Sequence, residues 1–295
     1  MIIGDLMNKI LVVDKDKDYT SRDVVNIISK HFKTKKVGHF GTLDPLATGV
    51  LVVGIGCFTK LGNILVSDDK EYVCDVLVGK STDTYDILGN VICENYVADL
   101  DFGCLSDALK SFIGTYEQEV PIYSAVKVDG KKLYEYARSG MEVVLPKKEV
   151  TIKKIELLDI YKKDNNLYFK FKSCVSKGTY IRSLVNDISK VINIPLCMSD
   201  LRRIRQDRFM IEDANKIEDI LSNNYKEVLL SDVISCDVVD IPFDLEKIIL
   251  NYGLIKYSSE KDFVIFRKDD KDIVLYGKYK KDEDYMKPYI ILKED

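Results

Sequence analysis

The segment from Lys36 to Leu51 constrains the fold more than any other part of the chain. It reads KVGHFGTLDPLATGVL and leads into a run of β-branched residues at Val50 to Ile55. Gly38 and Gly41 permit backbone paths that are closed to other residues, and Pro45 disfavours the helical conformation for Asp44. We therefore predict an irregular, rigid loop that carries one carboxylate and leads into a buried strand.

The same segment places an imidazole, His39, five residues before the carboxylate of Asp44. Loops fixed by a scaffold are common positions for reactive groups. Taken alone, these residues leave two interpretations open. The loop either carries a catalytic carboxylate or is an Asp-Pro turn with a solvated side chain.

Composition places the chain among ordinary globular proteins. Its 295 residues are 46% apolar and 31% charged, and no apolar run approaches the roughly 18 to 20 residues that span a bilayer. The stretch from Met1 to Asp14 lacks the features of a secretory signal, so we expect a cytoplasmic protein. The seven cysteines are scattered without a CxxC pair and there are only two histidines, so we expect neither a disulfide framework nor a metal site.

Net charge is a weak argument for a nucleic-acid partner. The chain carries 44 Lys and Arg against 48 Asp and Glu, a net charge of −4. From Glu212 onward the counts are 13 and 20, a net −7, which leaves 31 and 28, a net +3, for the preceding residues. Phosphate binding depends on the local patch rather than on the total. The acidity of the C-terminal part therefore does not exclude RNA as a partner.

Strand and helix patterns follow one another in a mixed order rather than as a repeating βαβ unit. We predict an α+β fold around a mixed, largely antiparallel sheet, with a catalytic domain over residues 1–224. A small C-terminal β-rich domain follows over residues 225–295, which either contacts RNA or solubilises the chain. The strands include 9–13, 71–78 and 167–174, Asp129-Gly130 marks a hairpin, and the helices begin at Thr20 or lie over 105–113, 132–138 and 179–191.

A series of short motifs extends from roughly Ile10 to Phe209. The longest, from Gly38 to Leu51, reads GHFGTLDPLATGVL. The others are, in chain order, Asp14-Lys15 with Thr20–Val25, Lys70-Glu71-Tyr72, Gly79 to Gly89, Tyr123 to Lys127 with Gly130, Cys174 to Leu184, and Leu201-Arg202-Arg203. In content and order they resemble the motifs of the bacterial TruB family of tRNA pseudouridine synthases. The resemblance implies the pseudouridine synthase fold.

The resemblance also implies a role for each matching residue. Asp44 corresponds to the catalytic aspartate, and Arg182 pairs with it and so favours its ionised form. Tyr72 corresponds to the active-site tyrosine, whose ring stacks on the flipped base. Substrate contacts are implied for His39, near the target base, and for Tyr180 and Leu201, in the uridine pocket.

Basic residues within the motifs are candidates for phosphate contact: Lys15 and Lys127, together with Lys177, Arg202 and Arg203. Without the resemblance, plainer interpretations stand beside these roles. The lysines are then solvated charges, Tyr72 and Leu201 are core residues, and Arg182 is a phosphate clamp on a helix surface.

Three aspartates depart from the family pattern. Asp16 and Asp18 stand where the opening motif usually has Pro and Gly, and Asp207 stands where Gly commonly follows Leu-Arg-Arg. The first two remove rigidity and add negative charge near the expected RNA surface. Since none of the three is the catalytic carboxylate, these departures concern RNA affinity and loop shape.

The implied reaction converts the T-loop uridine, at conventional tRNA position 55, to pseudouridine after the base is extruded. The base leaves C1′ through N1 and rejoins it through C5, with no atom lost and no redox change, so we expect no cofactor. The expected partner is the T-arm of tRNA, with no membrane, no metal and a monomeric protein. Two alternatives remain: a tRNA-folding chaperone on the same fold, and an unrelated module in which the Asp44 loop is only a turn.

Overall fold

The computed structural model describes residues 8–65, 69–269 and 271–292. The chain divides into two compact units. We call residues 1–45, 50–67 and 208–295 the terminal unit, and residues 46–49 and 68–207 the central unit. The division predicted after Asn224 falls inside the terminal unit and stays a prediction.

The N-terminal part of the terminal unit contains the predicted first strand and first helix. Strand β1 (Lys9–Lys15) neighbours β3 (Thr48–Ile55), and β2 (Val37–His39) pairs with β3 in antiparallel register. Helix α1 (Ser21–His31) begins with a capping box, in which the Thr20 hydroxyl accepts from the backbone N–H of Asp23 and the Asp23 carboxylate accepts from that of Thr20. The first strand and the capping box confirm the predictions from sequence. Strand β2 was not predicted, because the glycine-punctuated stretch that begins at Gly38 was expected to be irregular.

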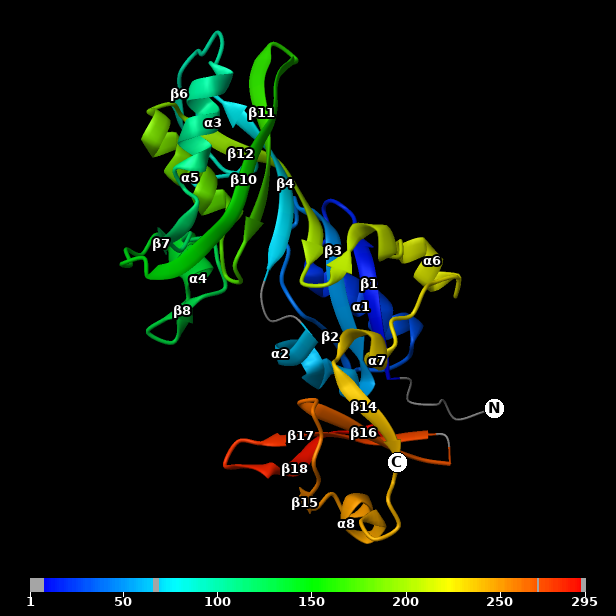
Figure 1. Cartoon of the computed structure of the whole chain (residues 1–295). Helices are drawn as coiled ribbons and strands as arrows, with labels where there is room; N and C mark the ends of the chain where they lie inside the picture. Colours follow the sequence, from blue (N-terminus) through cyan, green and yellow to red (C-terminus); the bar gives the residue numbers. More distant parts are fainter. Residues whose placement is uncertain (1–7, 66–68, 270, 293–295) are drawn as a thin grey trace. The chain divides into compact units, whose positions relative to one another are not determined.

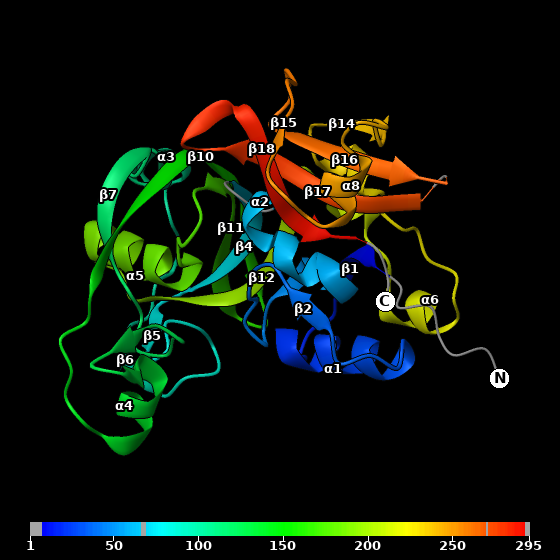
Figure 2. The same cartoon turned by 90° about the horizontal axis from the view of Figure 1, so that it is seen from below.

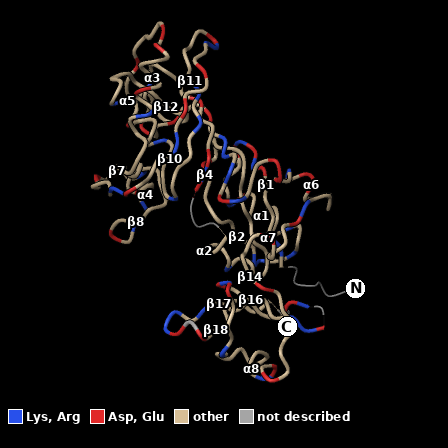
Figure 3. Tube along the Cα trace, viewed as in Figure 1, with Lys and Arg blue, Asp and Glu red and all other residues tan. Residues whose placement is uncertain are grey.

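The remaining elements of the terminal unit fall into two stretches of the chain. Two short helices directly follow β3, and the other elements follow the central unit. The described C-terminal sheet has five strands, in the order β14–β16–β17–β18–β15, and only the β14–β16 pair is parallel. Acidic and basic residues lie mainly at the ends of these strands and in the turns between them (Figure 3). The elements are η1 (Gly56–Leu61), α2 (Gly62–Leu65), β13 (Phe209–Met210), η2 (Ile211–Asp213), α6 (Ile217–Leu221), α7 (Leu230–Val233), β14 (Cys236–Asp240), α8 (Glu246–Leu250), β15 (Ile255–Lys256), β16 (Phe263–Lys268), β17 (Lys271–Tyr279) and β18 (Asp282–Ile291).

One hydrophobic core joins the first and last parts of the terminal unit. Ile10 and Val12 of β1 and Val50 of β3 are buried in the same cluster as Ile265 and Leu275 of the C-terminal sheet. The C-terminal sheet therefore completes the core beneath β1 and β3. Burial of such aliphatic side chains stabilises a fold by about 1.5–3 kcal/mol each.

The central unit is built on an antiparallel sheet in the order β12–β4–β11–β10–β7. Its helices α3 and α5 pack against this sheet and against each other (Figures 1 and 2). This sheet confirms the predicted α+β class. The elements are β4 (Lys70–Val78), β5 (Lys80–Thr82), β6 (Val91–Glu94), α3 (Phe102–Lys110), β7 (Gly114–Glu119), β8 (Lys127–Val128), β9 (Lys131–Lys132), α4 (Leu133–Ser139), β10 (Lys147–Lys163), β11 (Asn166–Val175), α5 (Ile181–Ile192) and β12 (Leu196–Gln206).

The first residues of β3 belong to the central unit, where Thr48 and Gly49 pair in parallel with Arg202 and Arg203 of β12. Gly49 has a φ of 99°, and a Cβ added there would lie 2.2 Å from the carbonyl oxygen of Arg203. Glycine is therefore required where the strand following the Asp44 loop meets β12. Across the described residues, we find no helix with the length and apolar character needed to cross a membrane.

The two aspartates that stand where the family pattern has glycine both have a left-handed backbone conformation. Asp18 has a φ of 69° and Asp207 a φ of 55°, both in the left-handed region. The backbone N–H of Asp18 donates to the carbonyl of Pro45 at 2.9 Å. Asp enters this region more readily than most residues, although at some cost relative to Gly. Asp18 and Asp207 therefore adopt a backbone conformation that glycine would adopt without steric cost.

We predict that Asp18→Gly raises the free energy of unfolding by up to about 1 kcal/mol, because glycine adopts a positive φ without strain. Urea denaturation measures the change. The neighbouring Lys17→Gly is the control, since Lys17 has no positive φ and glycine there should lower the free energy by about 0.5–1 kcal/mol. If both variants lowered the free energy of unfolding by the same amount, the backbone of Asp18 would not be strained.

Candidate functional site

Asp44 lies in the terminal unit on a loop that is held at both neighbouring residues. The backbone N–H of Leu43 donates to the Ser21 hydroxyl at 2.8 Å, and that hydroxyl donates to the Leu43 carbonyl at 3.2 Å. On the other side, the Pro45 carbonyl accepts from the backbone N–H of Asp18 and from the ammonium of Lys15. The carboxylate is half-buried, while the Leu43 side chain is buried. The loop therefore holds Asp44 in a defined backbone position.

Lys15 has a structural position rather than a surface one. Its side chain is fully buried, and its ammonium donates to the carbonyls of Asp16 at 2.9 Å, Tyr19 at 2.6 Å and Pro45 at 3.4 Å. These carbonyls satisfy a buried charge. The arrangement favours a role in shaping the Asp44 loop over the phosphate contact predicted from sequence.

His39 is the last residue of β2 and lies half-buried at the start of the loop. Its Nδ1 accepts from the backbone N–H of Gly41 at 3.4 Å. Strand pairing with Val53 of β3 fixes the backbone of His39. The imidazole is thus anchored on the strand that precedes the Asp44 loop.

Arg182 is the second residue of α5, in the central unit, and only 5% of its surface is exposed. One guanidinium nitrogen donates to the carbonyl of Thr84 at 3.2 Å and another donates to that of Tyr123 at 3.1 Å. The carboxylate of Asp86 lies 3.9 Å from Nε. A buried cation beside a carboxylate and two carbonyls is firmly oriented.

The turn between β5 and β6 supplies two of these contacts. Tyr85 lies between Thr84 and Asp86 with a φ of 65°, an uncommon conformation for an aromatic residue. The Asp86 carboxylate accepts from the Thr84 hydroxyl at 2.8 Å and from the backbone N–H of Leu88 at 3.0 Å. The left-handed residue thus lies between the carbonyl and the carboxylate that contact Arg182. Backbone strain of this kind is often found at functional sites.

Tyr72 and Leu201 share one face of the central sheet. Tyr72 is opposite Ser173 on β11 and Arg203 on β12, and Leu201 is opposite Cys74. Residues two apart on a strand face the same side, so the side chains of Tyr72, Cys74 and Leu201 lie on a common face. Tyr72 and Leu201 are 6% and 5% exposed. Both are largely buried in this structure, as the plainer interpretation also expected.

Tyr180 caps the N-terminus of α5, and a buried glutamine holds its backbone. The Gln118 side-chain oxygen accepts from the backbone N–H of Tyr180 at 2.8 Å, and its nitrogen donates to the Tyr116 hydroxyl at 2.8 Å. That hydroxyl donates in turn to Asp187 at 3.4 Å. Burial, and then the charge of Asp187, raise the pKa of Tyr116, so its hydroxyl stays a donor. The network fixes the end of the helix that carries Arg182.

Lys127 lies on the exposed β8–β9 hairpin, where Asp129 and Gly130 both have positive φ angles. This turn confirms the hairpin predicted from the Asp-Gly pair. Exposure keeps Lys127 available for contact with a partner.

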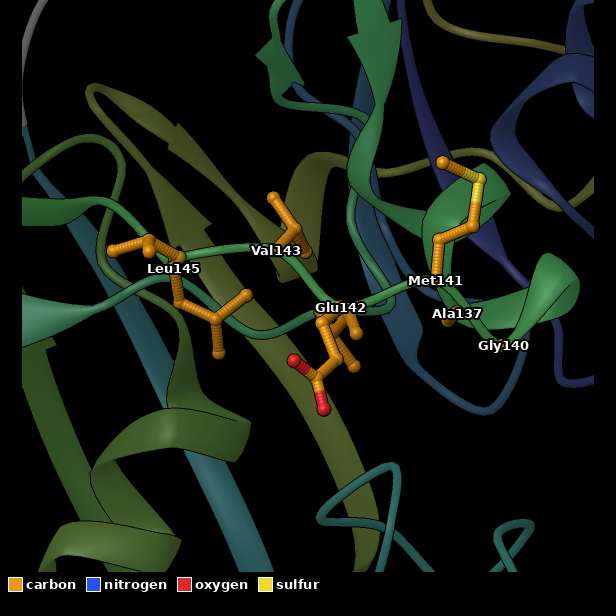
Figure 4. A pocket seen from close by; sticks show the side chains of 8 residues that line it. Ala137, Gly140, Met141, Glu142, Val143 and Leu145 are labelled. Atoms are coloured by element: carbon orange, nitrogen blue, oxygen red, sulfur yellow. The ribbon is translucent and has the colours of Figure 1, made fainter.

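A mostly apolar groove of about 620 Å³ lies beside α4 (Figure 4). Its lining comprises Ile122, Ala137 and residues 140–145, with none of the eight residues predicted from sequence. The exposed carboxylate of Glu142 and the side chain of Met141 project from the strap that forms it. We therefore assign the groove no part in the candidate site.

The predicted residues fall into two groups, one in each unit. The terminal unit holds Lys15, His39 and Asp44, and the central unit holds Tyr72, Lys127, Tyr180, Arg182 and Leu201. All seven cysteines are free. Within the described parts of the chain, no group of three or more His, Cys, Asp or Glu residues is placed to hold a metal ion.

Sequence reasoning missed Asp86 and Gln118 as functional candidates. Asp86 belongs to the Gly79–Gly89 motif, so its place in that motif was a usable signal. For Gln118 no local signal exists, because its partner Tyr180 is 62 residues away in the chain.

Comparison with known proteins gives a consistent result. The model of the TruB family pseudouridylate synthase N-terminal domain matches residues 29–181. The tRNA pseudouridine synthase B of Fusobacterium nucleatum is 46% identical over 206 residues, covering 70% of each chain. That of Lactobacillus acidophilus is 38% identical over 92% of this chain and 95% of its own. That of a Clostridium perfringens strain is 37% identical over 98% of this chain and 100% of its own.

Solved structures share the fold. A chain of a Cbf5–Nop10–Gar1 complex matches with a TM-score of 0.65 and 21% identity, covering 97% of this chain and 84% of that one. A chain of an H/ACA ribonucleoprotein bound to a substrate RNA matches with a TM-score of 0.66 and 19% identity, covering 97% and 85%. The fold is thus the pseudouridine synthase fold, and together with the family model and the close relatives it shows that this chain belongs to the TruB family of pseudouridylate synthases.

Proposed function

We propose that this chain isomerises the T-loop uridine of tRNA, at conventional position 55, to pseudouridine. Relatives that carry the name tRNA pseudouridine synthase B align over nearly its whole length. The observation that carries the proposal is the loop of Asp44, which lies within the region that the family model matches and is held at both adjacent residues.

Asp44 acts in this proposal as the essential carboxylate. Breaking the bond between N1 and C1′ and rejoining the base through C5 conserves every atom and requires no oxidant or reductant. The carboxylate attacks C6, attacks C1′ or removes the 2′ proton, and each route requires an ionised group held against the nucleotide and shielded from water. The fixed loop meets the positional part of this requirement.

Arg182 supplies the positive charge that pairs with the Asp44 carboxylate in the proposed mechanism. Its own orientation depends on Asp86 and on two backbone carbonyls. These contacts leave the guanidinium little freedom to rotate. Its orientation therefore stays the same when RNA binds in this proposal. We therefore regard Asp86 as a positioning residue.

Four of the other predicted residues bind the substrate in this proposal. Tyr72 stacks on the extruded base, Tyr180 and Leu201 line the uridine pocket, and His39 contacts RNA near the target. Extrusion costs a few kcal/mol, which base stacking on aromatic side chains offsets. The T-arm is recognised through its loop shape and phosphates, as is usual for folded RNA. Each protein copy acts alone.

We predict that Asp44→Asn abolishes pseudouridine formation, with a rate loss of at least about 10⁴-fold, because the amide keeps the shape but loses the charge. Purified protein and a T-arm stem-loop transcript are incubated without added metal, and pseudouridine is mapped by chemical labelling. A parallel reaction with a chelator should be equally fast. Wild-type protein that binds the transcript without modifying it would contradict the proposal and favour the chaperone.

We predict that Asp86→Asn lowers kcat by about 10- to 100-fold at unchanged RNA affinity, because Arg182 loses its fixed counter-charge. Single-turnover rates and binding titrations separate the two effects. Asp83→Asn in the same turn is the matched control, since its carboxylate bonds Asn90 instead. Equal losses in both variants would show that the turn, rather than the charge beside Arg182, matters.

We predict that Gln118→Leu lowers kcat by about tenfold and the free energy of unfolding by about 1–3 kcal/mol, because two partly buried groups lose their hydrogen bonds to a buried side chain. Gln118→Glu keeps the acceptor for Tyr180 and should recover part of kcat. Ser183→Ala removes another hydrogen bond between α5 and the sheet and is the control. If the loss of kcat in all three variants were simply proportional to the loss in the free energy of unfolding, a positioning role for Gln118 would be contradicted.

A further inference from the structure

Three lysines converge at one end of the central sheet. Lys70 is the first residue of β4 and is opposite Val175, the last residue of β11. Lys177 follows two residues later, on a loop that the Ser176 hydroxyl ties to the Thr151 backbone at 2.9 Å. The strands β4, β11 and β10 lie side by side in this order (Figure 1). We call Lys70, Lys148 and Lys177 the lysine cluster.

Lys148 completes the cluster from β10. Its ammonium lies directly against the backbone of Gly178, where an added Cβ would lie 1.9 Å from Nζ. Gly178 has a φ of 82°, so both the backbone conformation and the close approach of the lysine favour glycine here. The ammonium of Lys148 thus lies beside the loop that carries Lys177.

No carboxylate in the described residues balances these charges. None of the three ammonium groups forms an ion pair or hydrogen bond within that part of the chain. The nearest acidic neighbours of Lys70 in the sequence are engaged elsewhere, Asp69 with Lys153 at 2.7 Å and Glu71 with Lys172 and Arg205. The fully buried Arg203 adds a further positive charge near Lys70. The cluster therefore has an excess of positive charge.

We propose that the lysine cluster is an anion site that binds one backbone phosphate of the substrate RNA. The inference rests on the proposed function for the identity of the anion. A phosphate beside three ammonium groups relieves their mutual repulsion and forms charge-assisted hydrogen bonds. Lys177 also lies three residues before Tyr180 and five before Arg182, so the phosphate would be bound close along the chain to the start of α5.

The site couples RNA binding to protonation of Lys70. Burial, and then the charges of Arg203, Lys148 and Lys177, lower the pKa of Lys70 to about 8. A bound phosphate favours the charged form and raises that pKa. Below about pH 8 the lysine is already protonated, so affinity is at its highest there. Above that pH, binding must take up a proton, and affinity falls by up to about tenfold per pH unit until the pKa of the complex is reached.

The test measures the Kd of a fluorescein-labelled T-arm stem-loop by anisotropy, over a salt series and from pH 7 to 9. Lys148→Gln and Lys177→Gln should each weaken binding about 3- to 10-fold at 0.15 M salt and lower the slope of log K against log salt by about 0.7–0.9. Lys70→Gln should do the same at pH 7 and should remove most of the loss of affinity above pH 8. Lys163→Gln, an exposed residue at the other end of β10, is the control and should match wild type.

Thermal unfolding without RNA separates this site from a structural role. Removing one like charge from the cluster should leave each variant as stable as wild type or more stable. Cluster variants that keep the wild-type Kd, salt slope and pH profile would overturn the site while wild type still modifies the RNA. Wild type that neither binds nor modifies the T-arm would instead overturn the proposed function, and the identity of the anion with it.

Discussion

The backbone on either side of Asp44 is the constraint on which the proposed chemistry depends. A side-chain hydroxyl from the start of α1 holds Leu43, and a buried ammonium and a backbone N–H hold the Pro45 carbonyl. An unrestrained loop would distribute the carboxylate over many positions, and displacements of about 1 Å are enough to lower a rate by about 10²-fold. Two buried polar side chains, Ser21 and Lys15, stabilise this loop through hydrogen bonds to its backbone. Rigidity here results from satisfied hydrogen bonds rather than from apolar packing alone.

The central unit orients its own charge by different means. Arg182 is held by carbonyls from two separate segments and by one carboxylate, while Gln118 fixes the first turn of its helix. One of the two segments includes a tyrosine in the left-handed region. Such strain persists only where the surroundings determine the conformation, and here the contacts of Asp86 with Thr84 and Leu88 do so. Two rigid elements, each with its own supporting contacts, thus carry the residues assigned to catalysis.

Local patterns predicted much of the fold, while the residues assigned to the site stay a prediction. The capping box of α1, the Asp-Gly hairpin and the alternating strands depend on neighbours in the sequence, and the structure confirms them. The family motif identified Asp44. Burial of Lys15 escaped prediction because its carbonyl partners become close only after the loop has folded. Gln118 escaped because nothing beside it indicates a partner 62 residues away. Asp18 and Asp207, which stand where the family pattern has glycine, both have positive φ angles, which the sequence alone did not predict.

The shared core of the terminal unit has a consequence for biosynthesis. Strands β1 and β3 are made long before the side chains that complete their buried faces, such as Ile265 and Leu275. The central unit is nearly contiguous in sequence and has all its partners once about Asp207 has been made. At roughly 5–20 residues per second, several seconds or more pass before β16 and β17 are available. During that interval the first strands remain without these partners, so the terminal unit acquires its full core only after β16 and β17 have been made.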